Sequence, residues 1–183
     1  MIAPVTDDNS TAVSFYMPND QFYDFWTHTP IKGNGSMYNI GYVDFTSLPM
    51  YYQGGNIIPQ RLNSANTTTM LRQQPFNIVI APGADGTATG SLYIDEGTQN
   101  NQPAITLATM TYSNGVFKMT GTFDYATVNI AQITILGASS ASSSAGVVAA
   151  ASGLKAPAYD ATAQSLTYTV DIPLSKAFSV KLH

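Results

Sequence analysis

Few residues in this 183-residue chain could do acid, base or metal chemistry. The chain holds two histidines, His28 and His183, a single glutamate, Glu96, and no cysteine, so its sequence has no His-Glu-x-x-His or Cys/His metal spacing. Glycoside hydrolysis needs two carboxyl groups that face each other across a cleft. Asp95 and Glu96 are instead sequence neighbours before a glycine, which is typical of a turn. We therefore predict no catalytic residue, no metal site and no cofactor.

Other catalytic patterns are also absent from the sequence. It has no G-x-S-x-G nucleophile motif, and the glycines of residues 83–90 lack the Gly-Lys-Ser/Thr of a phosphate loop, so they predict a hairpin loop. His28 follows an aromatic run, and Asp7 and Asp8 precede a polar run. Both places favour turn residues over catalytic ones.

An aromatic cluster is the feature that best suits ligand binding. Residues 22–26 read Phe-Tyr-Asp-Phe-Trp, and they are accompanied by Tyr16, Tyr38, Tyr42, Tyr51 and Tyr52. Aromatic faces can stack on the C–H faces of sugar rings, but alternate side chains of a strand face opposite sides, so about half would face a core. We favour a structural role and keep sugar stacking as the alternative.

Charge is scarce in this chain. Only 10% of its residues are charged, and the formal net charge is -4. Soluble domains carry about 25% charged residues, and here 58 Ser, Thr, Asn and Gln residues take their place. The chain has no basic cluster, which argues against nucleic acid and anionic membranes as partners.

The composition also bears on location. No apolar run approaches the roughly 18 residues of a membrane span. Three Asn-x-Ser/Thr sequons, at Asn9, Asn34 and Asn66, predict possible N-glycosylation. We therefore expect a secreted glycoprotein, with a lysosome-like or vacuole-like compartment as the alternative.

Strand patterns dominate, and the clearest lies at residues 104–123. Two β-rich runs flank Asn114-Gly115, the dipeptide that favours a type I′ hairpin turn. Pairing Ser113 with Val116 places Tyr112 opposite Phe117, with Met110 and Met119 on the same apolar face.

Further strands are expected along the chain. Residues 166–172 and 178–182 alternate apolar and polar side chains, and shorter strands are expected at 13–16, 22–26, 56–58, 76–81, 91–94 and 130–136. The fold class is therefore all-β, with two antiparallel β-sandwich domains. A polar stretch at 61–74 suggests a division near residue 73, and the small residues of 138–153 suggest a mobile loop.

The order of several motifs resembles the C-terminal part of glycoside hydrolase family 31 α-glucosidases, especially the fungal maltase-like members. Residues 1–6 resemble the end of that family's last catalytic-barrel strand. The matching segments that follow are residues 13–18, 22–27, 48–60, 64–69, 71–82 and 90–97. Three positions depart from the family pattern: Gln53 stands where Arg is usual, Glu96 where Asp is usual, and His28-Thr29 where Gly-Glu is common.

The resemblance implies a retaining exo-hydrolase that removes α-linked glucose with two aspartates, both on a (β/α)8 barrel. No residue of this chain matches those sites. The implied division is the end of the last barrel strand at residues 1–8, a proximal β-sandwich domain with linker at 9–72, and a distal β-sandwich domain at 73–183. The implied partner is an N-terminal catalytic-barrel chain or segment, which would contact the α-glucoside, and the chain alone is predicted to be inactive.

Phe25, Trp26, Ile57 and Ile58 are the candidate anchors against such a barrel, and replacing Trp26 with Ala is expected to cost on the order of 3 kcal/mol. The competing hypothesis is a free-standing carbohydrate-binding or structural β-sandwich protein, in which Trp26 would serve as a ligand platform.

Overall fold

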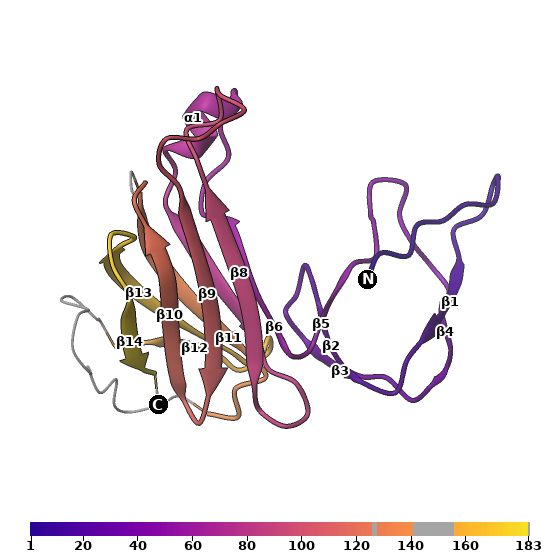
Figure 1. Cartoon of the computed structure of the whole chain (residues 1–183). Helices are drawn as coiled ribbons and strands as arrows, with labels where there is room; N and C mark the ends of the chain where they lie inside the picture. The colour runs from indigo at the N-terminus through magenta and orange to yellow at the C-terminus, as the bar shows by residue number, and fades with distance from the viewer. Residues whose placement is uncertain (126–127, 141–155, 183) are drawn as a thin grey trace.

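The computed structural model describes residues 1–125, 128–140 and 156–182. These residues form two all-β parts and one short helix (Figure 1). The predicted small-residue loop of 138–153 lies outside the described residues from position 141 onward. The all-β prediction is confirmed.

The N-terminal part consists of two small sheets. Strands β1 (Val13–Met17) and β4 (Ser36–Ile40) pair antiparallel as a ribbon. Strand β2 (Gln21–Asp24) pairs with both β3 (Pro30–Lys32) and β5 (Tyr51–Gln53) in a three-stranded sheet. Met17, Phe22 and Tyr51 are buried together where the ribbon meets this sheet.

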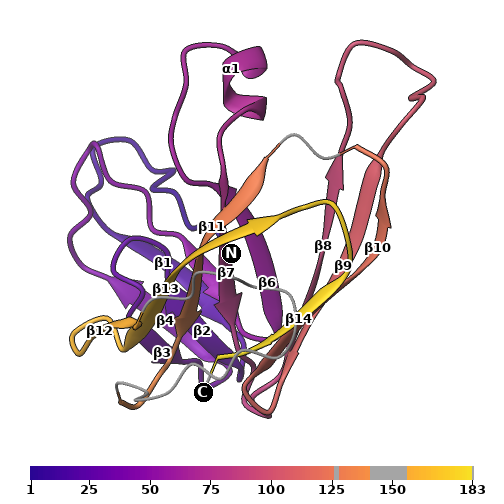
Figure 2. The same cartoon turned by 90° about the vertical axis from the view of Figure 1, so that its left-hand side faces the viewer.

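The C-terminal part is one nine-stranded sheet in the order β12-β13-β11-β7-β6-β8-β9-β10-β14. Its strands are β6 (Asn56–Arg61), β7 (Phe76–Ala81), β8 (Ala88–Ile94), β9 (Thr106–Ser113), β10 (Val116–Phe123), β11 (Asn129–Leu136), β12 (Ala158–Asp160), β13 (Ser165–Pro173) and β14 (Phe178–Lys181). A single bridge, Asn56 to Thr89, joins β6 to β8. Here the sheet bends, and the strands on either side form two layers (Figure 2).

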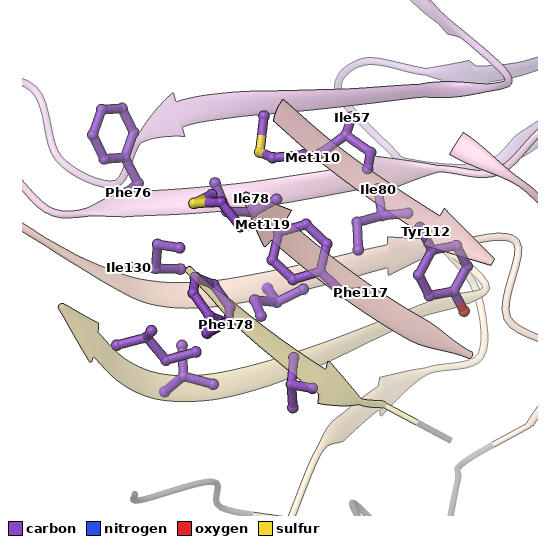
Figure 3. Close-up of a cluster of buried hydrophobic side chains, with 14 of the residues drawn as sticks. Ile57, Phe76, Ile78, Ile80, Met110, Tyr112, Phe117, Met119, Ile130 and Phe178 are labelled. Carbon is purple, nitrogen blue, oxygen red and sulfur yellow. The ribbon is translucent and has the colours of Figure 1, made fainter. Parts of the chain in front are cut away.

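The core fills the space between the two layers. Figure 3 shows Met110, Phe117 and Met119 facing the isoleucines of β7, Ile78 and Ile80. All five of these side chains are fully buried. The alternation predicted at 166–172 is confirmed, because its apolar members are buried and most of the residues between them are not.

The hairpin of β9 and β10 has the predicted register. Ser113 pairs with Val116 and Met110 with Met119. Asn114 and Gly115 have φ angles of 50° and 73°, as a type I′ turn requires. This prediction is confirmed because the turn and both strands are local in sequence.

Long-range pairing departs from the antiparallel pattern in two places, and one is the parallel bridge between β6 and β8. Strands β7 and β11 pair in parallel, with Ile78 opposite Ile133. Strand β6 lies before the predicted division near residue 73, yet it pairs along its whole length with β7. The polar stretch at 61–74 includes helix α1 (Thr68–Arg72), where the Thr67 hydroxyl accepts a hydrogen bond from the Met70 N–H at 3.2 Å.

Two motif glycines occupy positions where the backbone is crowded. A Cβ on Gly90 would lie 2.3 Å from the Ile57 carbonyl oxygen, at the bend where β8 passes β6. A Cβ on Gly54 would lie 2.9 Å from the Pro82 carbonyl oxygen, in the turn that joins the two parts. Larger residues at these places would force the strands apart.

A buried seam joins the two parts. Tyr23 and Tyr52 of the three-stranded sheet pack on Val79, Ala81 and Leu136 of the nine-stranded sheet. The Tyr23 hydroxyl donates a hydrogen bond to the Pro82 carbonyl oxygen at 2.9 Å. Burial raises the pKa of Tyr23 to about 12, so the phenol remains a donor at neutral pH.

Replacing Gln164 with Gly should stabilise the chain. Gln164 is exposed and has a φ of 49°, a left-handed conformation that non-glycine residues adopt only with strain. Relief of that strain, less the entropy that glycine loses on folding, gives an expected gain of about 0.5–1 kcal/mol. Urea unfolding of the two proteins measures it.

The control for that test is Gln164→Ala. It removes the same polar group but keeps the Cβ that causes the strain. Equal stability of the Gly and Ala variants would show that backbone strain at residue 164 is negligible.

Candidate functional site

Four of the eleven Asp and Glu side chains serve as local caps. The carboxylates of Asp24, Asp44, Asp85 and Asp160 each accept a hydrogen bond from a backbone N–H two residues further on. Asp95 pairs with the Arg72 guanidinium at 2.9 Å. Among the described residues, no three His, Asp or Glu side chains gather in a way that could hold a metal ion.

The turn before Gly97 predicted for Asp95 and Glu96 shows the same local bonding. The single glutamate accepts a hydrogen bond from the Thr98 hydroxyl at 3.0 Å. Where the resembling family usually has Arg, the Gln53 amide donates to Asp20 at 2.9 Å, and this bond is the main reason that the pKa of Asp20 lies below its ordinary value. Asp20 and Glu96 are therefore engaged in local structure.

The candidate anchors lie in three different surroundings. Ile57 is buried in the core of the nine-stranded sheet. Ile58 and Phe25 are half-buried and pack against the seam. Trp26 is 64% exposed, so within this chain it lies on the surface.

Trp26 is nevertheless held in place. Its indole Nε1–H donates to the Leu48 carbonyl oxygen at 2.8 Å, and its ring meets the Phe25 ring edge-on with centroids 4.9 Å apart. Its backbone N–H bonds the Asp24 carboxylate at 2.9 Å. An exposed aromatic ring fixed in this way is prepared for a contact, because little side-chain entropy remains to be lost.

Trp26 lines a groove of about 460 Å³. The other walls come from the end of β4, the loop at 41–49 and the start of β5, and they include Tyr42, Leu48, Pro49 and Tyr51. Asp24 and Asp44 are the charged residues of its lining. The groove is therefore aromatic and apolar, with only acidic charge.

The first residues of the chain lie beside this groove. The Met1 carbonyl oxygen accepts from the Tyr51 N–H at 2.8 Å, and the Ala3 N–H donates to the Pro49 carbonyl oxygen at 3.0 Å. Ile2 bridges to Met50 and is 62% exposed. In an antiparallel ladder the backbone groups of the middle residue point the other way, so this segment has an open edge.

The three sequons are accessible. Asn9, Asn34 and Asn66 are all exposed. The Asn34 side-chain oxygen accepts a hydrogen bond from the Ser36 hydroxyl at 2.5 Å, so these two sequon residues are in contact. No helix in the described part of the chain is long and apolar enough to cross a bilayer.

His28 occupies the turn predicted for it. Its φ is 62°, at a place where the resembling family commonly has glycine. Its ring centroid lies 6.3 Å from that of Tyr52. Burial lowers the pKa of His28, and the nearby carboxylates of Asp24 and Asp160 oppose that shift.

Sequence reasoning missed one exposed side chain of this region. Phe45, in the loop beside the groove, is fully exposed, with a relative exposure of 102%. Asp44 before it and Thr46 after it form an Asx-turn pattern, which could have indicated a tight turn here. No pattern in the sequence marks the ring itself as exposed.

The comparisons with known proteins agree with the motif order. The model of the glycosyl hydrolase family 31 C-terminal domain matches residues 1–58. A probable alpha/beta-glucosidase of Neosartorya fischeri is 38% identical over all of this chain. The chain belongs to glycoside hydrolase family 31. The matched model is that of the family's C-terminal domain, and the chain covers only 20% of the Neosartorya fischeri relative.

Other family 31 relatives share the same span. A probable alpha/beta-glucosidase of Aspergillus fumigatus is 41% identical over 96% of the chain, and the chain again covers 20% of it. The chain thus spans about a fifth of the length of the curated relatives that it matches.

Solved structures show the same fold. The glucosidase II alpha subunit bound to alpha3-Glc2 superposes with a TM-score of 0.79 at 18% identity, over 98% of this chain and 22% of that one. The dextranase FjDex31A of Flavobacterium johnsoniae, complexed with glucose, has a TM-score of 0.69 at 18% identity, over 98% of this chain and 25% of its own. The two-part β architecture is therefore that of family 31 enzymes.

Trp26→Ala should cost the isolated chain about 1 kcal/mol, less than the loss expected for a buried ring. It removes one hydrogen bond and one edge contact, but the indole is already largely in water. Chemical denaturation of the 183-residue chain measures the change. A loss near 3 kcal/mol should appear only where a partner surface covers the ring.

The matched comparison is Phe25→Ala, which removes a half-buried ring and should cost about 2 kcal/mol or more. If Trp26→Ala left the melting temperature unchanged but abolished a measurable affinity for maltooligosaccharides, Trp26 would be a ligand platform instead.

The free energy of unfolding should fall as pH drops, and His28 should account for part of that fall. Its folded pKa lies below the ordinary 6.5, so the unfolded chain takes up the proton first. The contribution is complete above about pH 6.5 and is lost as pH falls toward the folded pKa. Between pH 7.5 and pH 5, the free energy of unfolding should therefore fall more steeply for the parent than for His28→Asn. Denaturation curves recorded at several pH values measure this difference.

Asparagine is the suitable replacement because it tolerates the left-handed backbone and does not titrate. Parallel pH profiles for the two proteins would contradict the assignment, since the acidic groups of the chain are the same in both.

Proposed function

We propose that this chain is the non-catalytic C-terminal part of a secreted α-glucosidase that removes terminal α-linked glucose from maltose-like oligosaccharides by a retaining mechanism. The observation that carries the proposal is the combination of family 31 membership with acids that cap turns in the described residues. The reaction then belongs to a catalytic barrel in the remainder of the enzyme, held in another segment or another chain.

The role of the chain in this proposal is to stabilise that barrel. Residues 1–3 pair on one side with residues 49–51 and leave an open strand edge, as the end of the last barrel strand would. The groove beside them offers Trp26 and Tyr42 to a covering surface. The three exposed sequons support a secreted, glycosylated setting.

The distinct alternative is a free-standing carbohydrate-binding protein. The groove with its fixed indole favours it, because a rigid exposed ring also suits sugar stacking. Titration calorimetry with maltooligosaccharides separates the two roles. Saturable binding by the isolated chain would favour the alternative, and the proposal expects none.

The decisive test uses the Aspergillus fumigatus relative as a host. A hybrid is made in which this chain replaces the matching fifth of that protein, with which it is 41% identical. The isolated 183-residue chain should release no glucose from maltose, whereas the hybrid should release it. Glucose release by the isolated chain, or an inactive hybrid beside an active host, would contradict the proposal.

A further inference from the structure

Large exposed apolar side chains are unevenly distributed over the described residues. Eight of the eleven lie within residues 1–45, and the other three, Met70, Tyr93 and Leu107, lie in the C-terminal part. Two of the eight, Trp26 and Tyr42, line one groove, and exposed apolar side chains that gather in one place mark an interaction surface. Phe45 is the most exposed member.

The turn under Phe45 is rigid. The Asp44 carboxylate accepts hydrogen bonds from the Thr46 N–H at 2.9 Å and from the Thr46 hydroxyl at 2.6 Å. The Ser47 N–H donates to the Asp44 carbonyl oxygen at 2.9 Å. These bonds from Thr46 hold the pKa of Asp44 below its ordinary value, so the cap stays charged and in place at neutral pH.

The base of the loop is also fixed. Val43 is buried, and its N–H donates to the Thr11 carbonyl oxygen at 2.6 Å. The neighbours of Phe45 in sequence, Asp44 and Thr46, both line the groove that holds Trp26. Phe45 therefore lies at the rim of the groove on a loop whose backbone is fixed by hydrogen bonds, so little conformational entropy remains to be lost on binding.

We propose that Phe45 is an anchor residue that fills an apolar pocket on the catalytic remainder of the enzyme, with Trp26 and Tyr42 covered beside it. This inference rests on the proposed function. An aromatic ring held on a rigid turn has the properties of an interface hot spot, because its burial gains apolar contact at a small cost in entropy.

The length of the relatives identifies this occupant. The chain covers about a fifth of each full-length relative, so most of such a protein lies outside the matched segment, and the proposed function places that remainder against these domains. The apolar face around the groove is contiguous with residues 1–3, which carry the open strand edge. Because the charged lining residues of the groove are Asp24 and Asp44, the covering surface should supply hydrogen-bond donors or basic groups rather than acids.

The test compares Phe45→Ala in two settings, the isolated chain and the hybrid with the Aspergillus fumigatus relative. In the isolated chain the melting temperature should not change, because the ring is fully exposed. In the hybrid the rate of thermal inactivation should rise about tenfold, the size of effect that loss of a hot spot brings. Leu107→Ala is the control, since Leu107 is half-exposed on β9 and lies outside the groove.

The outcomes separate the two claims. An active hybrid whose Phe45→Ala variant is as stable as its parent overturns the anchor and leaves the proposed function standing. An inactive hybrid counts against the proposed function, and the anchor falls with it. Dimers of the isolated chain that Phe45→Ala dissolves would show that a second copy covers the ring, which also overturns the inference.

Discussion

The packing of Tyr23 and Tyr52 on Val79, Ala81 and Leu136 is the interaction on which the rest of the arrangement depends. It sets a small three-stranded sheet against a large nine-stranded one, and the bond from the Tyr23 hydroxyl to the Pro82 carbonyl oxygen adds direction to the apolar contact. Phe25 packs on the same seam and supports the ring of Trp26. The Trp26 side of the groove is therefore supported by contacts with the C-terminal part.

The scarcity of charge has a structural counterpart in how the acids are used. Four aspartates cap turns through their carboxylates, and a fifth pairs with Arg72. For Asp44 and Asp85 the hydrogen bonds from their own loops lower the pKa, which does not suit a general acid. The acids thus build rigid turns, and two of these turns present Trp26 and Phe45.

Local features of the fold were predictable from the sequence. The register of β9 and β10 follows from Asn114-Gly115 and from alternation on either side of it, all within twenty residues. The order of motifs along residues 1–97 identified the family, which the comparisons confirmed. Long-range features were not predictable, and the parallel pairing of β7 with β11 and the inclusion of β6 in the large sheet are two of them. Such pairings join segments tens of residues apart, and local alternation carries no information on which strand lies next to which.

The sequence by itself determined that the chain is all-β, that it is a family 31 C-terminal part, and that it lacks the pattern of a catalytic or metal site. These properties depend on residue type and local spacing. Only the tertiary structure decided which aromatic rings are buried: Tyr23 and Tyr52 lie in the seam, while Trp26 and Phe45 face outward. The physical reason is that burial is a property of neighbours brought together by folding, so aromatic rings a few residues apart in sequence, such as Tyr23 and Trp26, can have opposite surroundings.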